Sequence, residues 1–335
     1  MKLEEFKKLI LDDSDSHLEN LAREAKRVRT ERFGNAIKIY APLYVSNECI
    51  NGCIYCGFNH TSKIERKTLT VDEATCEAQA LLDAGHRHIL LVTGEHPKAA
   101  PIDLLCDVTS ELRKKAASVS IEGKPCTEDE YKKLAESGVD GVTLYQETYD
   151  RQAYADMHPS GPKNDYDNRL NAIDAAGRAG MRFLGIGALL GLSDWRREAC
   201  ALFEHAQTLI KRHWKSSLTI SVPRIRSQGI DFSPPYPVND RELTQMICAL
   251  KIALPDCGVI LSTRESAQLR DNLLPLGITQ MSAGSVTNPG GYTNDDNSGK
   301  QFSIDDNRTA AQVAKHLKSV GFDPVFKDWE SILHG

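Results

Sequence analysis

The sequence predicts a (β/α)8 barrel of the TIM type, with a helical extension before it and a helical tail after it. Two observations carry this prediction. Eight short apolar stretches alternate with amphipathic, helix-like stretches, and a small or apolar residue followed by glycine precedes several of the strands, at Gly85, Gly138, Gly180 and Gly277. Apolar strands that alternate with helices favour a parallel sheet covered by helices. Eight such units close into a barrel.

Along the chain, residues 1–35 form the expected N-terminal extension, because their apolar spacing is helical and Gly34-Asn35 is a typical helix end. The barrel is expected over residues 36–300. A tail over residues 301–335 follows, with a helix from Ala310 to Gly321 packed on the barrel. We find no linker or change in composition that divides the chain further.

The eight strands are recognised as runs rich in Val, Ile, Leu and Tyr. They are Ala36–Val45, His88–Thr93, Ser118–Ile121, Gly141–Tyr145, Arg182–Leu189, Leu218–Val222, Val259–Ser262 and Ile278–Ser282. The helices between them fall at about Val71–Ala84, Asp103–Ala116, Glu128–Glu136, Arg169–Ala179, Trp195–His213, Asp240–Ala253 and Ser266–Leu274.

Composition excludes several classes of partner. The net charge of -5 and the pI near 6.1 give no electrostatic reason to expect nucleic acid or an anionic membrane. No apolar run reaches the roughly 18 residues of a membrane span, and Met1-Lys2-Leu3-Glu4-Glu5 opens a charged helix rather than a signal peptide. Nine cysteines, an odd number, favour reduced thiols. We therefore expect a cytoplasmic protein.

Three thiols lie close together in the loop after the first expected strand. Cys49, Cys53 and Cys56 fall within eight residues, which leaves a four-iron cluster one protein ligand short. An iron with an open position can bind and activate a small molecule, whereas a structural metal site has all its ligands. The alternative is a zinc site completed by His60.

Polar residues stand at the carboxyl ends of the other strands, where active sites of such barrels lie. They are Gly94-Glu95, Gln146-Glu147, Arg224, Arg264 and Ser285. The guanidinium of Arg264 matches a carboxylate with two hydrogen bonds, although an ion pair with Glu265 is the alternative. Arg224 and Ser285 are further candidates for the same pocket. Arg169, by pattern alone, opens a helix on its solvent side.

The C-x3-C-x2-C loop, with Tyr55 before its last cysteine, resembles that of the radical S-adenosylmethionine enzymes. The resemblance implies a [4Fe–4S] cluster on Cys49, Cys53 and Cys56, with S-adenosylmethionine bound to the fourth iron. It also implies cofactor-binding roles for other residues: Tyr55 in the loop, Gly94 and Glu95 at the cofactor's ammonium group, Arg169 at its carboxylate, and Gln146 and Glu147 at its ribose.

Longer stretches look like those of the tyrosine lyases of thiamin thiazole biosynthesis, the 2-iminoacetate synthases. They include Leu91-Val92-Thr93-Gly94-Glu95-His96, Tyr145-Gln146-Glu147-Thr148-Tyr149 and Leu261-Ser262-Thr263-Arg264-Glu265-Ser266. The resemblance implies cleavage of the Cα–Cβ bond of L-tyrosine to 2-iminoacetate (dehydroglycine) and 4-cresol, with 5′-deoxyadenosine and methionine as co-products. It further implies Arg264 as the substrate's carboxylate ligand, a transient thiazole synthase partner, and a reductant such as flavodoxin or ferredoxin.

Three alternatives stay open at this point. A related lyase for another aromatic amino acid, such as a tryptophan lyase, would share the cluster. The tyrosine lyase of [FeFe]-hydrogenase maturation shares His158-Pro159-Ser160-Gly161-Pro162-Lys163, but it carries three more cysteines in a C-terminal extension, whereas no cysteine follows Cys257 here. A non-catalytic metal-binding scaffold is the alternative of a different class.

Overall fold

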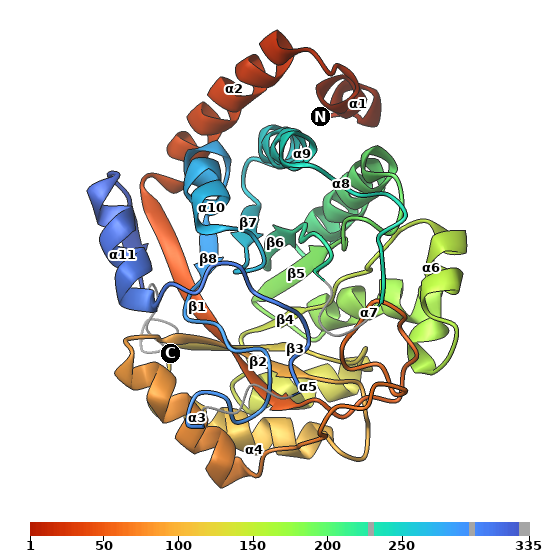
Figure 1. Ribbon diagram of the computed structural model, residues 1–335, viewed down its shortest axis with the longest axis vertical. Helices are drawn as coiled ribbons and strands as arrows, with labels where there is room; N and C mark the ends of the chain where they lie inside the picture. The colour runs from red at the N-terminus through yellow and green to blue at the C-terminus, as the bar shows by residue number, and fades with distance from the viewer. Residues whose placement is uncertain (227–230, 295–298, 328–335) are drawn as a thin grey trace.

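Eight parallel strands close into a barrel in the computed structural model, which describes residues 1–226, 231–294 and 299–327 (Figure 1). Each strand pairs with the next, and β1 pairs with both β2 and β8, which closes the ring. The strands are β1 Ala36–Ser46, β2 His88–Thr93, β3 Ser118–Glu122, β4 Gly141–Thr143, β5 Phe183–Gly187, β6 Ser217–Ser221, β7 Gly258–Leu261 and β8 Gln280–Ser282. The predicted fold class is confirmed.

Helices surround the barrel. They are α3 Val71–Asp83, α4 Ile102–Leu112, α5 Glu128–Glu136, α6 Arg151–Met157, α7 Tyr166–Arg178, α8 Trp195–Arg212, α9 Asp240–Ala253 and α10 Ala267–Leu273. Capping boxes start α3 at Thr70, α5 at Thr127 and α9 at Asn239. The four predicted glycine stops all have positive φ, with Gly85 at 96°, Gly138 at 102°, Gly180 at 85° and Gly277 at 153°.

Successive side chains of β1 point alternately into the apolar layer under the helices and into the inside of the barrel. Ile37, Ile39, Ala41 and Leu43 point away from the barrel axis and are fully buried in the apolar layer under the helices. The residues between them, such as Lys38, Tyr40, Pro42 and Tyr44, line cavities inside the barrel. Because side chains of a strand alternate between its faces, one strand contributes both to the packed core and to a lumen lined by polar as well as apolar side chains.

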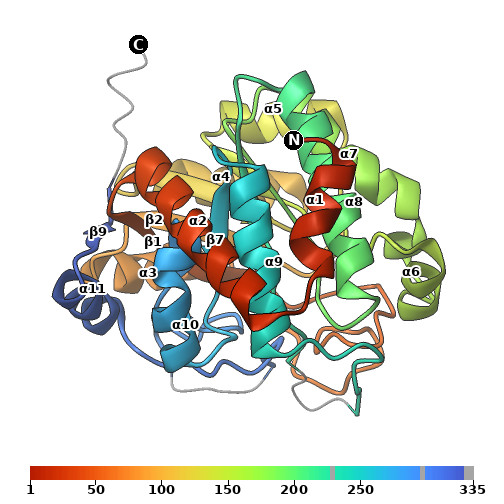
Figure 2. The same ribbon diagram turned by 90° about the horizontal axis from the view of Figure 1, so that it is seen from above.

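The N-terminal extension consists of α1 Leu3–Leu11 and α2 Asp15–Phe33, which pack outside the barrel. Figure 2 shows them lying across α8 and α9. Phe6 stacks on Phe203 of α8 with ring centroids 4.6 Å apart. Arg29, 1% exposed, donates to the carbonyls of Ile278 and Ala36 at 3.2 and 2.9 Å, which ties α2 to the barrel.

Several elements differ from the sequence-based prediction, most clearly in the tail and around α6 and α7. The described part of the tail contains α11 Ala310–Ser319 and also a short strand, β9 Asp323–Val325, which pairs with the start of β1. The short helix α6 was not predicted. Helix α7 begins at Tyr166 rather than at Arg169, because Asp165 caps it by accepting from the amide of Asn168. Within the described residues, no helix combines the length and the apolar character that crossing a bilayer requires.

Candidate active site

The three-cysteine loop leaves β1 where the ladder is irregular. The register with β2 shifts between Tyr44 and Ser46, and such a bulge bends a strand and redirects the chain. Neighbouring loops then hold the cysteine loop through its backbone. The amide of Ile50 donates to the carbonyl of Glu95 at 3.2 Å, and the amide of Gly52 donates to the carbonyl of Ser160 at 2.9 Å. The loop therefore has a fixed path on the upper rim, the edge formed by the carboxyl ends of the strands.

Arg66 holds together the two segments that precede and follow the cysteines in the same loop. Its guanidinium donates to the carbonyls of Asn47 at 2.6 Å, Phe58 at 3.0 Å and Asn59 at 2.6 Å. These carbonyls flank the cysteines on both sides. A planar group with five donors can bind several carbonyls at once, so Arg66 organises the loop without touching a thiol. No local sequence pattern around Arg66 predicts this role.

The thiols suit an iron–sulfur cluster better than one metal ion. Among the described residues, no three His, Cys, Asp or Glu side chains converge as they would around a single ion. His60, the suggested fourth zinc ligand, is exposed. The thiolates that bind a four-iron cluster reach different irons, so they need not converge. Burial raises the pKa of the Cys53 thiol, and the positive charge of Lys163 offsets only part of that effect.

Four charged side chains lie beside the loop, and we call them the charge cluster: Glu95, Glu147, Lys163 and Arg169. Arg169 donates to Glu95 at 2.8 Å and to Glu147 at 3.4 Å. Lys163 bonds to Glu147 at 2.7 Å, with its Nζ 3.9 Å from Glu95. Arg169 is 5% exposed, so its placement on a solvent-facing helix surface, expected from pattern alone, is wrong. It lies in the first turn of α7 and faces the barrel.

Glu147 combines a buried carboxylate with an unusual backbone. Its φ is +70°, in a region that non-glycine residues rarely occupy. The amide of Leu189 donates to its carbonyl at 2.7 Å, which helps to hold this conformation. The pKa of Glu147 is lowered despite the opposing effect of burial, because Lys163 and Arg169 favour its charged form. Strained backbone of this kind is common at functional sites.

Three further predicted cofactor residues lie near the charge cluster or the cysteine loop. Tyr55 is buried and bonds through its hydroxyl to Nε2 of His158 at 2.7 Å. Gln146 is 2% exposed, and its amide donates to the carbonyl of Tyr166 at 3.3 Å. Gly94 passes close to the cysteine loop, since a Cβ there would lie 2.2 Å from the carbonyl oxygen of Glu48. Only a glycine fits at this crossing.

Two adjoining cavities open at the upper rim. The thiol-side cavity holds about 520 Å3, its open mouth included, and is lined by Tyr55, Cys56, Glu147 and Lys163. The Arg264 chamber holds about 490 Å3 and is lined by Tyr44, Leu90, Val92 and Ser285 among others. Both cavities share Glu122, Tyr145, Pro223, Arg264 and Phe302. A ligand can therefore lie between a thiol of the loop and the guanidinium of Arg264.

Arg264 faces this space and does not form the alternative ion pair with Glu265. Its guanidinium carbon lies 3.4 Å from the ring centroid of Phe302. Arg224 instead bonds to Glu265 through Nε at 2.9 Å and pairs with Asp240 at 2.8 Å. Arg224 does not line either cavity, whereas its neighbour Arg226 lines the thiol side. The structure therefore brings Arg264 to the site and commits Arg224 to Glu265.

Ser285 and Glu122 also lie in the chamber. The hydroxyl of Ser285 is buried and has no hydrogen-bond partner among the described residues. Glu122 ends β3, and burial raises its pKa to about 7, with the charge of Glu147 adding to the effect. Such a group can exchange a proton near neutral pH. Glu122 is not among the residues predicted from sequence, although its position at a strand end was a usable signal.

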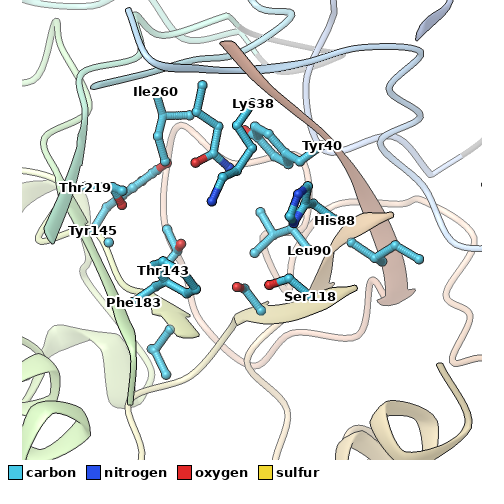
Figure 3. Close-up of a pocket in the computed structure, with 15 residues that line it drawn as sticks. Lys38, Tyr40, His88, Leu90, Ser118, Thr143, Tyr145, Phe183, Thr219 and Ile260 are labelled. Atoms are coloured by element: carbon cyan, nitrogen blue, oxygen red, sulfur yellow. The ribbon is translucent and has the colours of Figure 1, made fainter. Parts of the chain in front are cut away.

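A third cavity lies deeper in the barrel, between the first halves of the strands (Figure 3). Figure 3 shows the amine of Lys38 pointing into it, with Tyr40, His88, Ser118 and Thr143 around it. It shares Tyr40, Leu90 and Tyr145 with the Arg264 chamber. The open lumen therefore continues below the site, with polar side chains among its lining, where many barrels of this type are filled by branched apolar side chains.

A barrel that carries an incomplete thiol set on its upper rim, with a buried charge cluster beside it, defines the class of radical S-adenosylmethionine enzymes. The model of the Radical SAM superfamily matches residues 43–203, and that of the Biotin and Thiamin Synthesis associated domain matches residues 221–323.

The 2-iminoacetate synthase of Escherichia coli is 41% identical over 97% of this chain and 86% of its own length. That of Salmonella typhimurium is 41% identical over 95% and 84%. The crystal structure of HydG, a maturase of the [FeFe]-hydrogenase, superposes with a TM-score of 0.93 at 36% identity and covers 97% of this chain and 73% of that one. This chain belongs to the 2-iminoacetate synthase family. It is a radical S-adenosylmethionine lyase, and its cofactors are a [4Fe–4S] cluster and S-adenosylmethionine.

Proposed function

We propose that this chain cleaves the Cα–Cβ bond of L-tyrosine to 2-iminoacetate and 4-cresol. One observation carries the proposal beyond family membership: the thiol-side cavity is lined both by Cys56 and by Arg264. A carboxylate held by Arg264 would thus place an amino acid beside the cluster loop. The product proposed, 2-iminoacetate, is the one after which the two similar synthases of Escherichia coli and Salmonella typhimurium are named.

The cluster and the cofactor, when bound, supply the one-electron chemistry that removes a hydrogen atom from the substrate. We propose that Cys49, Cys53 and Cys56 hold the cluster. Tyr55, Gly94, Glu95, Gln146, Glu147 and Arg169 form the cofactor's binding site. The buried carboxylate of Glu95 is a suitable acceptor for an ammonium group.

The remaining groups position the substrate. Arg264 is proposed to bind the substrate's carboxylate through two parallel hydrogen bonds, with Phe302 fixing the plane of its guanidinium. Ser285 can donate to the same carboxylate. Glu122 can accept a proton from the substrate's ammonium, because its pKa is near 7. Arg224, a candidate from sequence, would act on the site through Glu265 rather than by contact.

Partners follow from the product's chemistry. An imine is readily hydrolysed by water, so we propose that 2-iminoacetate passes to a thiazole synthase in a transient complex. A reductant such as flavodoxin or ferredoxin would reduce the cluster. All nine cysteines are free thiols, which suits a reducing compartment, and we propose the cytoplasm.

The decisive experiment is an anaerobic assay of the reconstituted protein with S-adenosylmethionine, a reductant and one amino acid at a time. Tyrosine should yield 5′-deoxyadenosine, 4-cresol and 2-iminoacetate in matched amounts. If tryptophan gave a cleavage product and tyrosine gave none, the tyrosine assignment would be wrong. A protein with a full cluster that never formed 5′-deoxyadenosine would be a metal-binding scaffold.

A further inference from the structure

We propose that the amine of Lys38 captures the cleavage product 2-iminoacetate as a covalent lysine imine. The site is the third cavity described above, which we call the lower cavity (Figure 3). The inference rests on the proposed lyase function and adds a second site to it. This site would take a two-carbon imino or oxo acid and would hold a product that free water hydrolyses.

The lower cavity adjoins the chamber in which the product would form. The two cavities have Tyr40, Leu90 and Tyr145 in common. The lower cavity holds about 600 Å3, its open mouth included, and small residues such as Ser120 and Gly185 form part of its wall. A molecule of two carbons is therefore small enough to move down from the Arg264 chamber to this cavity.

Lys38 presents a primary amine to this cavity. It lies on the inner face of β1, and Figure 3 shows its amine pointing into the open space. Its Nζ lies 4.9 Å from the ring centroid of Phe183, a contact that favours a positive charge on the nitrogen. A protonated lysine imine carries the same charge as the ammonium, so the contact with Phe183 suits the site both before and after capture.

Among the described residues that line the three cavities, Lys163 is the other lysine. Its ammonium donates to Glu147 at 2.7 Å, with Glu95 at 3.9 Å from the same nitrogen. An amine must give up a proton before it attacks carbon, and adjoining carboxylates favour the protonated form. Lys163 is thus committed to the charge cluster, and Lys38 is the amine that the lower cavity offers to the product.

Polar side chains beside Lys38 suit the carboxylate of such a product. Gln280 of β8 is paired with Lys38 in the register of the two strands, and both line the lower cavity. Ser118 and Ser120 of β3 contribute hydroxyl groups to the same cavity. Amide and hydroxyl groups donate hydrogen bonds to a carboxylate, so the wall offers donors next to the amine that would form the covalent bond.

The capture step exchanges one imine for another. Nζ of Lys38 attacks the imine carbon of 2-iminoacetate, the bond from that carbon to the product's own nitrogen breaks, and ammonia leaves. The ammonium of Lys38 passes two of its three hydrogens to the departing nitrogen, which gives a protonated lysine imine and neutral ammonia. No oxidant or reductant takes part. Because one carbon–nitrogen double bond replaces another, the step is reversible and the product can be released again.

The test traps the imine by reduction. The reconstituted protein turns over tyrosine isotopically labelled at Cα, with S-adenosylmethionine, a reductant and cyanoborohydride, which reduces a protonated lysine imine to carboxymethyl-lysine. A resin-bound alkoxyamine, too large to enter the barrel, removes product that escapes into solution. Peptide mass analysis should find the labelled carboxymethyl group on Lys38 at about 10-fold or more the level on the exposed Lys26, because the product forms next to the lower cavity.

Lys38→Arg is the matched variant, because it keeps a positive charge beside Phe183 but cannot form an imine. The label on residue 38 should be absent. Without the resin, the ratio of glyoxylate, the hydrolysis product, to 4-cresol in solution after the first turnover should rise. Lys26→Arg, on the exposed face of α2, is the control and should leave that ratio unchanged. Trapping on the unmodified protein needs no variant, so it decides alone if Lys38→Arg fails to fold.

The proposal is overturned if 4-cresol forms while Lys38 is labelled no more than Lys26, or if Lys38→Arg leaves the glyoxylate ratio unchanged. Absence of 4-cresol is instead a failure of the proposed function. In that case glyoxylate and cyanoborohydride are added to the reconstituted protein, because glyoxylate forms the same lysine imine with loss of water. Faster modification of Lys38 than of Lys26 then supports a site for two-carbon oxo acids, and equal or slower modification overturns it.

Discussion

The two halves of the site differ in whether their buried polar side chains have partners within the protein. On the side of the cysteine loop, where we propose that the cofactor binds and which we call the cofactor side, Glu95, Glu147, Lys163 and Arg169 pair with one another and are nearly inaccessible. On the side of the Arg264 chamber, Ser285 lacks a partner among the described residues and Arg264 meets an aromatic face.

The difference indicates how each half is stabilised before a ligand arrives. Buried charges without partners are costly, so the cofactor side must satisfy its own ions to remain folded. The chamber can leave a hydroxyl and a guanidinium facing a polar cavity, where a ligand completes their bonds. We therefore expect changes on the cofactor side to affect stability as well as binding, and changes in the chamber to affect mainly the substrate.

The largest effect is expected from Cys53→Ala. Losing one of three thiols should prevent stable cluster binding, so that 5′-deoxyadenosine and 4-cresol both fall below detection. Iron and sulfide analysis with product chromatography would show it. Cys106→Ala is the control, because Cys106 packs in the apolar core between α4 and its neighbours and should leave the iron content unchanged. Full iron content in Cys53→Ala would contradict the assignment of the loop.

Arg169→Met tests the cofactor side as a structural unit. It removes a buried cation and leaves Glu95 and Glu147 with Lys163 alone. The free energy of unfolding should fall by about 3 kcal/mol, as expected when one partner of a buried ion pair is lost. Denaturant unfolding of the protein would measure the change. Arg178→Met, at an exposed pair with Glu128, should cost less than about 1 kcal/mol.

Arg264→Lys tests the chamber. A lysine keeps the charge and loses the two parallel donors, so kcat/KM for tyrosine should fall about 100-fold. The midpoint of thermal unfolding should stay within a degree or two, because Arg264 makes no ion pair with Glu265. Arg224→Lys should show the reverse, with lower stability and a smaller effect on KM. Equal kinetic losses in both variants would remove the distinction between the two arginines.

The smallest expected effect is that of Glu122 on the pH dependence of thermal stability. Its pKa is raised from 4.5 to about 7 in the folded protein, so the folded state binds the proton more tightly than the unfolded state does. The associated stability is present below pH 4.5 and is lost as the pH rises through 7. Glu122→Gln should therefore melt a few degrees higher than the unmodified protein at pH 8 and almost equally at pH 4.5. Equal melting temperatures of Glu122→Gln and the unmodified protein at pH 8 would contradict this expectation.

Much of this arrangement could be predicted from local sequence. The bounds of β2, α5 and α9 agree with the apolar patterns, and the rule that sites follow the strands located Glu95, Glu147 and Arg264. These features depend on short stretches of chain, which carry their own periodicity and caps. Strand ends were less reliable, because β4 stops at Thr143 and β8 starts at Gln280, each two residues inside the apolar run.

The contacts between distant segments could not be predicted in this way. Phe302 stacks on Arg264 across 38 positions, and Lys163 meets Glu95 across 68. No local sequence pattern predicts these contacts, because they depend on how the loops fold over the rim. The solvent-facing expectation for Arg169 failed for a related reason: the cap at Asp165 starts α7 earlier and turns Arg169 toward the barrel. Part of the predicted tail, residues 328–335, lies outside the described residues.

The segment Gln301–Phe302 touches both halves of the site. The carbonyl of Gln301 accepts from the amide of Gly57 at 3.2 Å, one residue past the last cysteine of the loop, and its side-chain oxygen accepts from the hydroxyl of Tyr44 at 2.7 Å. Phe302 covers Arg264. A displacement of these two residues would therefore open the chamber and uncover the thiol loop in a single event. Admission of the substrate and exposure of the iron to dioxygen would then share one cause, and inactivation in air should accelerate with turnover.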